Sequence, residues 1–392
     1  MYAQNAEIEI YIWQDPDWPN WRYQLDELAP LLEQASRLQG FLYGRLADVG
    51  FDVREQTFLC ALTEDVVKSS AIEGEVLSPE SVRSSIARRL GIEQASLAPV
   101  DRHVEGVVDM MLDATSRADE PVSAQRLFGW HAALFPTGYS GLRPINVAHW
   151  RSDEQGSIQV ISGPISAPHR PKTHQQIHYE APPAPVLLRE MKLFLDWINQ
   201  THPTKPEPAL IKAAIGHLWF VTLHPFDDGN GRIGRAIGDL LLARADKNKQ
   251  RFYSLSAQIQ AQRKGYYDIL EGTQKGSMDI TAWIHWFLSQ LVLALETAHA
   301  TVDSALVKTK FWQHWAGVSL NPRQIKILNR LLDGFDGFDG KLTTSRWGSM
   351  TKCSSDTALR DINQLIELGI MQHAPGGGRS TSYELTPAHT KQ

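Results

Sequence analysis

The chain has 392 residues, of which 42% are apolar and 21% charged, with a net charge of −5. This length allows two or three domains with buried cores, and the charge excludes a protein that is basic overall. The two cysteines, Cys60 and Cys353, cannot build a disulfide framework or a zinc ribbon, which favours a reducing compartment. No apolar run is long enough to span a membrane and residues 1–13 do not resemble a signal peptide, so we expect a cytoplasmic protein.

Helical periodicity dominates the first 115 residues, which we predict to form an N-terminal helical domain (residues 1–115). Apolar residues recur at helical spacing from Leu25 to Gly40, where we expect the first helix to end. The same pattern returns over residues 54–73, and Gly74 is a good helix terminator. The sequence Ser-Pro-Glu from Ser78 predicts the start of a third helix over residues 78–90.

Glu73 lies at the C-terminal end of the second predicted helix. A carboxylate at this position faces the negative end of the helix dipole, which is unfavourable by up to about 1 kcal/mol. We therefore expect either a compensating cation beside Glu73 or simple solvation of its side chain.

The densest helical pattern covers residues 123–245 and is interrupted at 137–186 by a loop rich in Gly, Pro and His. Residues 157–161 in this loop are typical of a short strand, and residues 153–156 before it are typical of a turn. A connection of this length is usually functional. The loop also contains His169, His174 and His178, but neither cysteines nor an HExxH motif accompany them, which disfavours a metal site.

The most informative segment is HPFDDGNGRIGR, from His224 to Arg235. An apolar helix upstream must stop before Pro225, and apolar residues recur at helical spacing downstream from Ile233. The segment is therefore a tight loop that leads into the N-terminus of a helix. Its Gly-Asn-Gly core, residues 229–231, tolerates positive φ at three successive positions, and such a backbone together with the helix dipole attracts phosphate.

Charged and titratable side chains surround this loop. Arg232 and Arg235 are three residues apart, so both can bring forked donors to the same rim. Asp228 is a hard oxygen ligand that suits Mg²⁺ bridging phosphates. His224 titrates near neutrality and suits a general base, whereas Phe226 is expected to anchor the loop in the core.

These residues match the signature of Fic-domain proteins, HxFx(D/E)GNGRxxR, at every specified position, and the similarity extends from Gln125 to about Ala300. The resemblance implies a mostly α-helical core over residues 116–318 with a small β-hairpin flap over 153–164. Family members of this type transfer AMP from Mg·ATP to a Tyr, Ser or Thr hydroxyl of a protein, and pyrophosphate leaves. His224 would deprotonate that hydroxyl, and Asp228 would hold Mg²⁺ on the α- and β-phosphates.

The resemblance also implies that the rest of the motif binds the phosphates of ATP. These residues are Gly229, Asn230, Gly231, Arg232, Ile233, Gly234 and Arg235. Asn230 would reach the α-phosphate within an anion hole, and Arg235 matches the ligand of the γ-phosphate. Kinase-like members carry Lys where Gly231 stands, so phosphorylation is less expected.

The segment SSAIEG, Ser69 to Gly74, resembles the inhibitory motif (S/T)xxxE(G/N) of this family. In related proteins this glutamate pairs with the second arginine of the signature, here Arg235, and blocks productive binding of the γ-phosphate. The resemblance implies that Glu73, on an inhibitory helix over residues 54–74, holds the enzyme inhibited. In some relatives the same glutamate also supports removal of AMP.

The flap strand, residues 158–161, resembles a hairpin that pairs with an extended target segment by strand addition, although it could equally be a small two-stranded cover. Ile161 aligns with residues that contact adenine, and Tyr266 and Tyr267 align with a tyrosine pair in the same pocket. An aromatic pair on a helix is also typical of a buried core.

Residues 321–388 resemble a winged helix, with a helix over 322–332, a recognition helix over 355–368 and a wing over 376–382. From 321 to 392 the chain has nine Lys or Arg and seven Asp or Glu, a balance of +2, which is weak for DNA binding. A DNA partner, a protein partner and self-association therefore stay open, and relatives are often homodimers.

Two other functions stay open from the sequence. One is a DNA-binding regulator or toxin-like module with a vestigial Fic core. The other is a Fic enzyme with another nucleotide donor, because the predicted loop binds phosphates rather than the base.

Overall fold

The structure is a computed structural model, and it describes residues 10–47, 49–92, 98–152, 158–162, 176–200, 206–332, 342–375 and 381–386. These residues are mostly helical, as predicted, with a few short strands. They divide into two compact units, Met1–Arg45 with Phe58–Ala298 and Leu46–Thr57 with His299–Gln392. Most of the first two predicted domains falls in the first unit, whereas residues 46–57 and 299–318 fall in the second. Among the described residues, no helix combines the length and apolar character needed to cross a membrane.

The N-terminal helices follow a short 3-10 turn, Ile12–Gln14. Helix α1 spans Leu25–Ala47, so the predicted end at Gly40 is wrong; the apolar stripe continues through the fully buried Leu42. Helix α2 spans Phe51–Ile72 and ends just before Gly74, which has a φ of 84° as the predicted terminator requires. Helix α3 spans Pro79–Leu90, and the Ser78 hydroxyl caps it by accepting from the Ser81 N–H.

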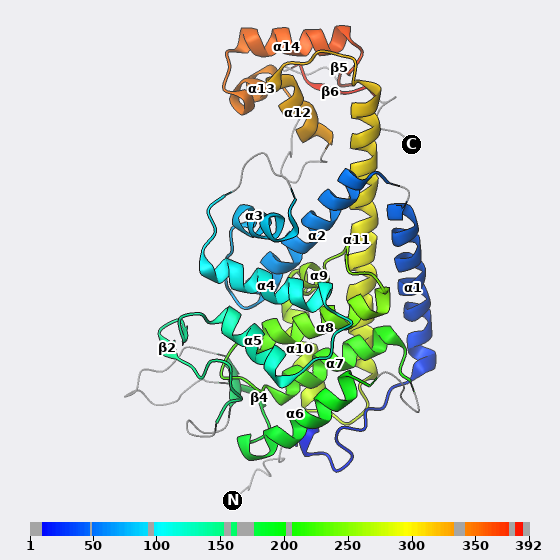
Figure 1. Ribbon diagram of the computed structural model, residues 1–392. Helices are drawn as coiled ribbons and strands as arrows, with labels where there is room; N and C mark the ends of the chain where they lie inside the picture. Colours follow the sequence, from blue (N-terminus) through cyan, green and yellow to red (C-terminus); the bar gives the residue numbers. More distant parts are fainter. Residues whose placement is uncertain are drawn as a thin grey trace, which may run out of the picture. The chain divides into compact units, whose positions relative to one another are not determined.

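Helices α7 (Ala209–Leu223) and α8 (Asn230–Asp246) form the centre of the first unit (Figure 1). Two glycines allow them to approach closely. A Cβ at Gly216 would lie 2.4 Å from the Leu241 Cδ1, and a Cβ at Gly234 would lie 2.6 Å from the Val221 Cγ1. The close packing brings the C-terminus of α7 and the N-terminus of α8 together, with only the motif loop between them.

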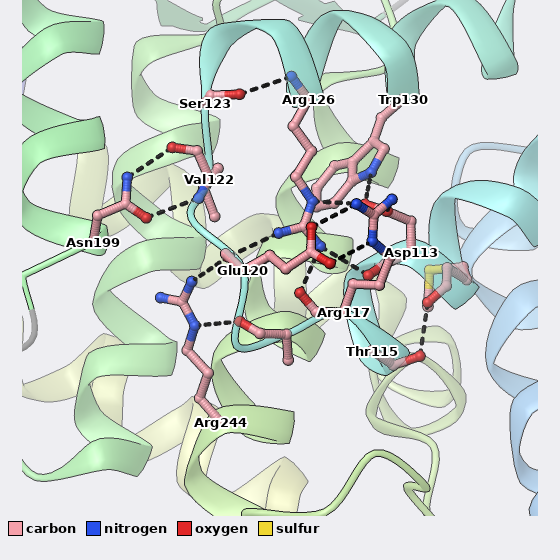
Figure 2. A network of polar contacts seen from close by, with 12 residues as sticks. Asp113, Thr115, Arg117, Glu120, Val122, Ser123, Arg126, Trp130, Asn199 and Arg244 are labelled. Carbon is pink, nitrogen blue, oxygen red and sulfur yellow. Dashed lines mark hydrogen bonds and ion pairs between the residues drawn. The ribbon is translucent and has the colours of Figure 1, made fainter.

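A polar network fixes the other end of α8 (Figure 2). It joins α8 to α4 (Arg102–Ser116), α5 (Ala124–Leu134) and α6 (Ala184–Ile198). The Arg244 guanidinium of α8 donates to the carbonyls of Ala118, Glu120 and Ile198 at 2.6, 3.1 and 2.8 Å. Asp113 of α4 accepts from the Arg126 Nε at 2.6 Å and from the Trp130 Nε1 at 2.7 Å. These bonds satisfy carbonyls in the α4–α5 turn and hold the axis of α8.

Two hairpins lie between α5 and α6. The first pairs β1 (Tyr139–Ser140) with β2 (Arg143–Pro144), and the second pairs β3 (Gln159–Ser162) with β4 (Gln176–Glu180), both antiparallel. The predicted flap strand is thus present, paired from Gln159 to Glu180. The predicted turn at 153–156 and the residues His169 and His174 lie outside the described residues. His178 is described, and its Nδ1 pairs with Glu271 at 2.5 Å.

The remaining helices of the first unit are α9 (Leu255–Ala261), α10 (Arg263–Gln274) and the first part of α11 (Thr281–His314). The second unit contains α12 (Pro322–Leu332), α13 (Thr344–Thr351), α14 (Ser355–Glu367), β5 (Met371–His373) and β6 (Tyr383–Leu385). Its core includes the buried Trp347, Ile362 and Tyr383. The predicted helices over 322–332 and 355–368 are confirmed, whereas α13 was not predicted. The tip of the predicted wing lies outside the described residues.

Candidate functional site

His224 ends helix α7 in a left-handed backbone conformation, with a φ of 48°. Its Nδ1 lies 3.3 Å from the Val221 carbonyl. Because a carbonyl only accepts, Nδ1 carries the proton and Nε2 is the basic nitrogen. Burial lowers the pKa of His224 to about 4, so the imidazole is neutral at physiological pH. The side chain is therefore in the protonation state that a general base requires.

Phe226 and Asn230 fix the shape of the loop that follows. The Asn230 side chain accepts from the Phe226 N–H at 2.9 Å and donates to the Phe226 carbonyl at 2.8 Å. Phe226 is fully buried, as predicted, and its ring stacks on that of His131 at 4.2 Å. Asn230 is thus committed to the loop, which leaves one amide hydrogen and its backbone N–H for an anion.

Of the three loop residues that tolerate positive φ, only Gly229 adopts it, at 81°. Asn230 and Gly231 are instead the first residues of α8, in helical conformation. The anion-binding element is therefore the N-terminus of a 17-residue helix rather than a run of left-handed residues. The unpaired N–H groups of a first helical turn and the helix dipole still attract phosphate there.

Asp228 lies beside this helix N-terminus and is half-buried. Its Oδ2 accepts from the Ser140 hydroxyl, and its Oδ1 accepts from the Gly229 N–H at 2.5 Å. The Asp228 carbonyl is 3.2 Å from the His131 Nε2. Within the described ranges, no three or more His, Cys, Asp or Glu side chains gather as a metal cage. One carboxylate, a hydroxyl and phosphate oxygens are a donor set that suits Mg²⁺, which keeps several waters and binds few protein ligands.

Arg235 is buried and contacts the end of α2. Its Nε donates to the Ser69 hydroxyl at 2.9 Å and its Nη2 to the Ser69 carbonyl at 2.9 Å. The same Nη2 lies 2.8 Å from the Glu73 Oε1, so the predicted partners are paired. Burial opposes the charge of Arg235, but the Glu73 carboxylate outweighs it and raises the pKa of the guanidinium.

The Glu73 carboxylate sits directly on the helix N-terminus. A Cβ added to Gly231 would lie 2.1 Å from the Glu73 Oε1, so only glycine leaves room for this contact. The cation expected near the C-terminus of α2 is also present, since the Arg263 Nε donates to the Ile72 carbonyl at 2.7 Å. Glu73 thus lies over the N-terminus of α8, beside Gly231 and Arg235.

A second carboxylate occupies the other motif arginine. The Arg232 Nη1 lies 2.9 Å from the Glu75 Oε2, and the Glu75 Oε1 lies 3.0 Å from the His103 Nε2. The hydrogen bond to Glu75 raises the pKa of His103. Burial opposes the charge of Glu75, but the bond from His103 and the charge of Arg232 lower its pKa. Both motif arginines are therefore neutralised by residues two positions apart.

The two tyrosines of the predicted adenine pocket lie differently. Tyr266 is 2% exposed, and its hydroxyl is 2.9 Å from the His217 Nε2 in the core. Tyr267 is 37% exposed, and its hydroxyl is 3.4 Å from the Ile72 carbonyl at the end of α2. The side chain of Ile161 lies outside the described part of the chain. The adenine assignments stay predictions, and Tyr267 is the member of the pair that offers surface. Ile233 is fully buried and supports α8 from the core.

Five residues of this site were not predicted from the sequence. They are Glu75, His103, His131, Ser140 and Arg151. Four of them contact a motif residue across at least 73 positions of chain, and His103 contacts Glu75. Glu75 alone carried a signal, since it follows Glu73 by two residues on an exposed turn.

Comparison with known proteins finds that residues 121–242 match the model of the Fic/DOC family and that residues 11–92 match that of a domain of unknown function, DUF4172. A protein adenylyltransferase Fic of Nematostella vectensis is 29% identical over 150 residues, 38% of this chain and 31% of the relative. That of Drosophila ananassae is 35% identical over 98 residues, 25% of this chain and 18% of the relative. The matched region thus spans less than a third of the length of these relatives.

Two solved structures are also similar. A Fic family protein from Desulfovibrio desulfuricans G20 has 20% identity and a TM-score of 0.49, covering 91% of this chain and 96% of that one. Fic-1 of C. elegans, residues 134–508, has 19% identity and a TM-score of 0.45, covering 73% of this chain and 75% of that one.

Proposed function

We propose that the chain is a protein adenylyltransferase that transfers AMP from Mg·ATP to a Tyr, Ser or Thr hydroxyl of a protein. One observation carries the proposal: a neutral imidazole, a carboxylate and two arginines converge on one helix N-terminus within twelve residues. The names of the relatives that match the Fic domain support it.

In the proposed reaction the His224 Nε2 takes the proton of the target hydroxyl. The hydroxyl oxygen forms a bond to the α-phosphorus, the bond between the α-phosphorus and the bridging oxygen breaks, and pyrophosphate leaves. The N–H groups at the start of α8 would stabilise the charge on the phosphate oxygens, and Arg232 and Arg235 would hold the outer phosphates. Fixed positions for base, donor and acceptor supply most of the expected acceleration.

Asp228 would hold Mg²⁺, with the Ser140 hydroxyl orienting its carboxylate. When bound, the cation neutralises charge on the phosphates and helps the pyrophosphate to leave. The His131 ring supports Asp228, because its Nε2 donates to the Asp228 carbonyl. The Ala148 N–H donates to the His131 Nδ1 at 3.1 Å, which fixes the tautomer of the ring.

The target would dock as an extended segment along the β3–β4 hairpin. Within the described residues each of these strands pairs only with the other, so each has an outer edge that can accept a further strand. Ile161 and Tyr267 would then line the adenine pocket, with Tyr266 behind them.

We further propose that Glu73 inhibits the enzyme by occupying Arg235 and the space over Gly231. The contact in place favours this role, since a phosphate on Arg235 would meet the carboxylate 2.8 Å from the Nη2. The same carboxylate lies near the proposed phosphate site and would be placed to support removal of AMP.

The experiment uses ATP labelled on either the α- or the γ-phosphate, with the Glu73→Gly protein and its Glu73→Gly/His224→Ala counterpart. Transfer of the α-label alone, lowered about 10²–10⁴-fold without His224, supports the proposal. Transfer of the γ-label would show phosphorylation instead. If no label transfers from ATP, a panel of other nucleotides and a salt-dependent DNA-binding assay test the two alternatives.

A further inference from the structure

A short segment, Asn146 to Arg151, runs along the motif loop and bonds to it at several points. The Asn146 N–H donates to the Asp227 Oδ2 at 2.9 Å. The Arg151 N–H donates to the Pro225 carbonyl at 2.9 Å, and the Arg151 Nε donates to the His224 carbonyl at 2.8 Å. The Trp150 ring packs 5.1 Å from that of Phe226. The proposed base and the loop residues that follow it, up to Asp227, are therefore held by a segment outside the signature.

Arg151 makes the decisive contacts of this segment. It is 3% exposed, and its Nη2 also donates to the carbonyls of Leu223 and Pro182. Leu223 and His224 end α7, so the guanidinium satisfies helix carbonyls that would otherwise lack partners. It also places a cation where the helix dipole favours one.

We propose that Arg151 is a positioning residue of the reaction, which holds His224 in its left-handed conformation and keeps a cation beside it. The inference rests on the proposed role of His224 as the base. Pro182 lies two residues after Glu180, the last residue of strand β4. The same guanidinium therefore joins the proposed target-binding strand to the base.

The charges that face His224 come from three elements. Arg151 favours the neutral imidazole, while Asp228 of the loop and Glu73 after α2 favour the protonated one. The Val221 carbonyl also favours the protonated form. Loss of Arg151 removes the cation from this set, so His224 should become easier to protonate.

The test compares Arg151→Gln and Arg151→Lys with Arg244→Lys, all in the Glu73→Gly protein. Arg244 is a matched control, because it also donates to three backbone carbonyls but at the far end of α8. His224 is titrated by NMR, assigned by its loss in His224→Ala, and AMP transfer is measured across the pH range. We expect Arg151→Gln to raise the pKa of His224 by about one unit and to lower transfer more at acid than at alkaline pH. Arg151→Lys, which keeps the charge but not the fork, should leave the titration in place and slow transfer about tenfold or more at all pH values.

An unchanged His224 titration in Arg151→Gln, or equal losses in Arg151→Lys and Arg244→Lys, would overturn the proposal. If Arg151→Gln does not fold, the comparison of the two lysine variants decides. The titration requires no AMP transfer, so it separates this inference from the proposed function.

A different observation carries a second inference. The Arg232 side chain is 6% exposed and pairs with Glu75, which in turn pairs with His103. Neither Glu75 nor His103 belongs to the inhibitory motif. A carboxylate and an outer phosphate group compete for the same forked donors. We infer that Glu75 and His103 form a second inhibitory contact, on Arg232, which opens separately from the Glu73 contact. This inference rests on the proposed binding of phosphates by Arg232.

The test measures Mg·ATP affinity by calorimetry in Glu73→Gly with and without Glu75→Gln or His103→Gln. Glu80→Gln is the matched control, because Glu80 is an exposed glutamate in the first turn of α3. We expect Glu75→Gln to tighten ATP binding about three- to tenfold beyond Glu73→Gly, and the control to have no effect. Hydrogen exchange of residues 74–77, without nucleotide, should rise in Glu75→Gln and His103→Gln but not in Glu80→Gln. An ATP affinity that does not change in Glu75→Gln would overturn the inference. If no variant binds ATP, unchanged hydrogen exchange of residues 74–77 in Glu75→Gln and His103→Gln would overturn it.

Discussion

The contact between α2 and α8 has two ends that differ in burial. At one end Asp65 of α2 pairs with Arg251 at 2.9 Å, and Arg251 pairs with Asp239 of α8 at 2.5 Å. All three side chains are at most 4% exposed. At the other end the side chains of Glu73 and Glu75 are 32% and 37% exposed, although their arginines are buried. The first end is a closed core network, and the second opens to solvent on its carboxylate side.

The register makes this a matched comparison. Asp65 and Ser69 of α2 and Glu73 directly after it recur every four residues. They meet Asp239, Arg235 and Gly231, which recur every four residues on α8. Breaking a buried ion pair strands a charge in the core, whereas an exposed carboxylate can return to water at little cost. The Glu73 contact can therefore open while Asp65 keeps the helix in place, as the proposed inhibition requires.

The largest expected effect comes from breaking the buried end. Asp65→Ala removes the acceptor of Arg251, of the Ser254 hydroxyl and of the Ser256 N–H. We expect the free energy of unfolding to fall by roughly 3–5 kcal/mol, measured by chemical denaturation. Asp268→Ala is the control, because its pair with Lys264 is exposed. Equal stability of the two variants would show that the Asp65 network does not hold the fold.

A smaller loss is expected between the ends, at Ser69. Its hydroxyl accepts from the buried Arg235 Nε, so Ser69→Ala leaves a charged donor without a partner and should cost roughly 1–3 kcal/mol. Ser70 is the matched control, since its hydroxyl is buried without a hydrogen-bond partner among the described residues. Ser70→Ala should be neutral or stabilising in the same denaturation experiment. A loss at Ser70 as large as at Ser69 would contradict this reading.

At the exposed end, Glu73→Gln should change stability by less than about 1 kcal/mol, because the carboxylate is partly hydrated. Its effect should appear instead in the affinity for Mg·ATP, which rises once Arg235 is free of the negative charge. Thermal unfolding and calorimetry of the same samples check both parts. A large loss of stability with no gain in affinity for Mg·ATP would show that Glu73, like Asp65, mainly stabilises the fold.

The smallest expected effect is a pH dependence of the Glu75 contact. The pKa of His103 is raised above its ordinary 6.5, so the positive charge beside Glu75 is fully present below 6.5 and is lost as the pH rises through the raised value. In Glu73→Gly, ATP should therefore bind more tightly at about pH 8 than at about pH 6, and His103→Gln should reduce that difference. The same pH dependence in both proteins would exclude His103 as its source.

The sequence predicts the part of this site that lies within one short segment. His224, Asp228 and the arginines are close in sequence, so their loop and helix could be inferred from periodicity and from Pro225. Glu73 needed the family motif, because a lone carboxylate after a helix is usually solvated. Arg151 and His103 could not be inferred, since single residues far along the chain carry no pattern and their partners depend on packing. Gly231 does not use its tolerance of positive φ; its missing side chain instead leaves space for Glu73, which the sequence did not indicate.

The central claim is that the exposed end of the α2–α8 contact controls AMP transfer while the buried end maintains the fold. It is tested most directly by measuring the rate of α-label transfer and the unfolding temperature of wild type and Glu73→Gly side by side. We predict a rate increase of about 5- to 150-fold, the usual range for release of a coupled contact, with a nearly unchanged unfolding temperature. Equal rates, or a faster rate only in a protein that has lost stability, would contradict the claim.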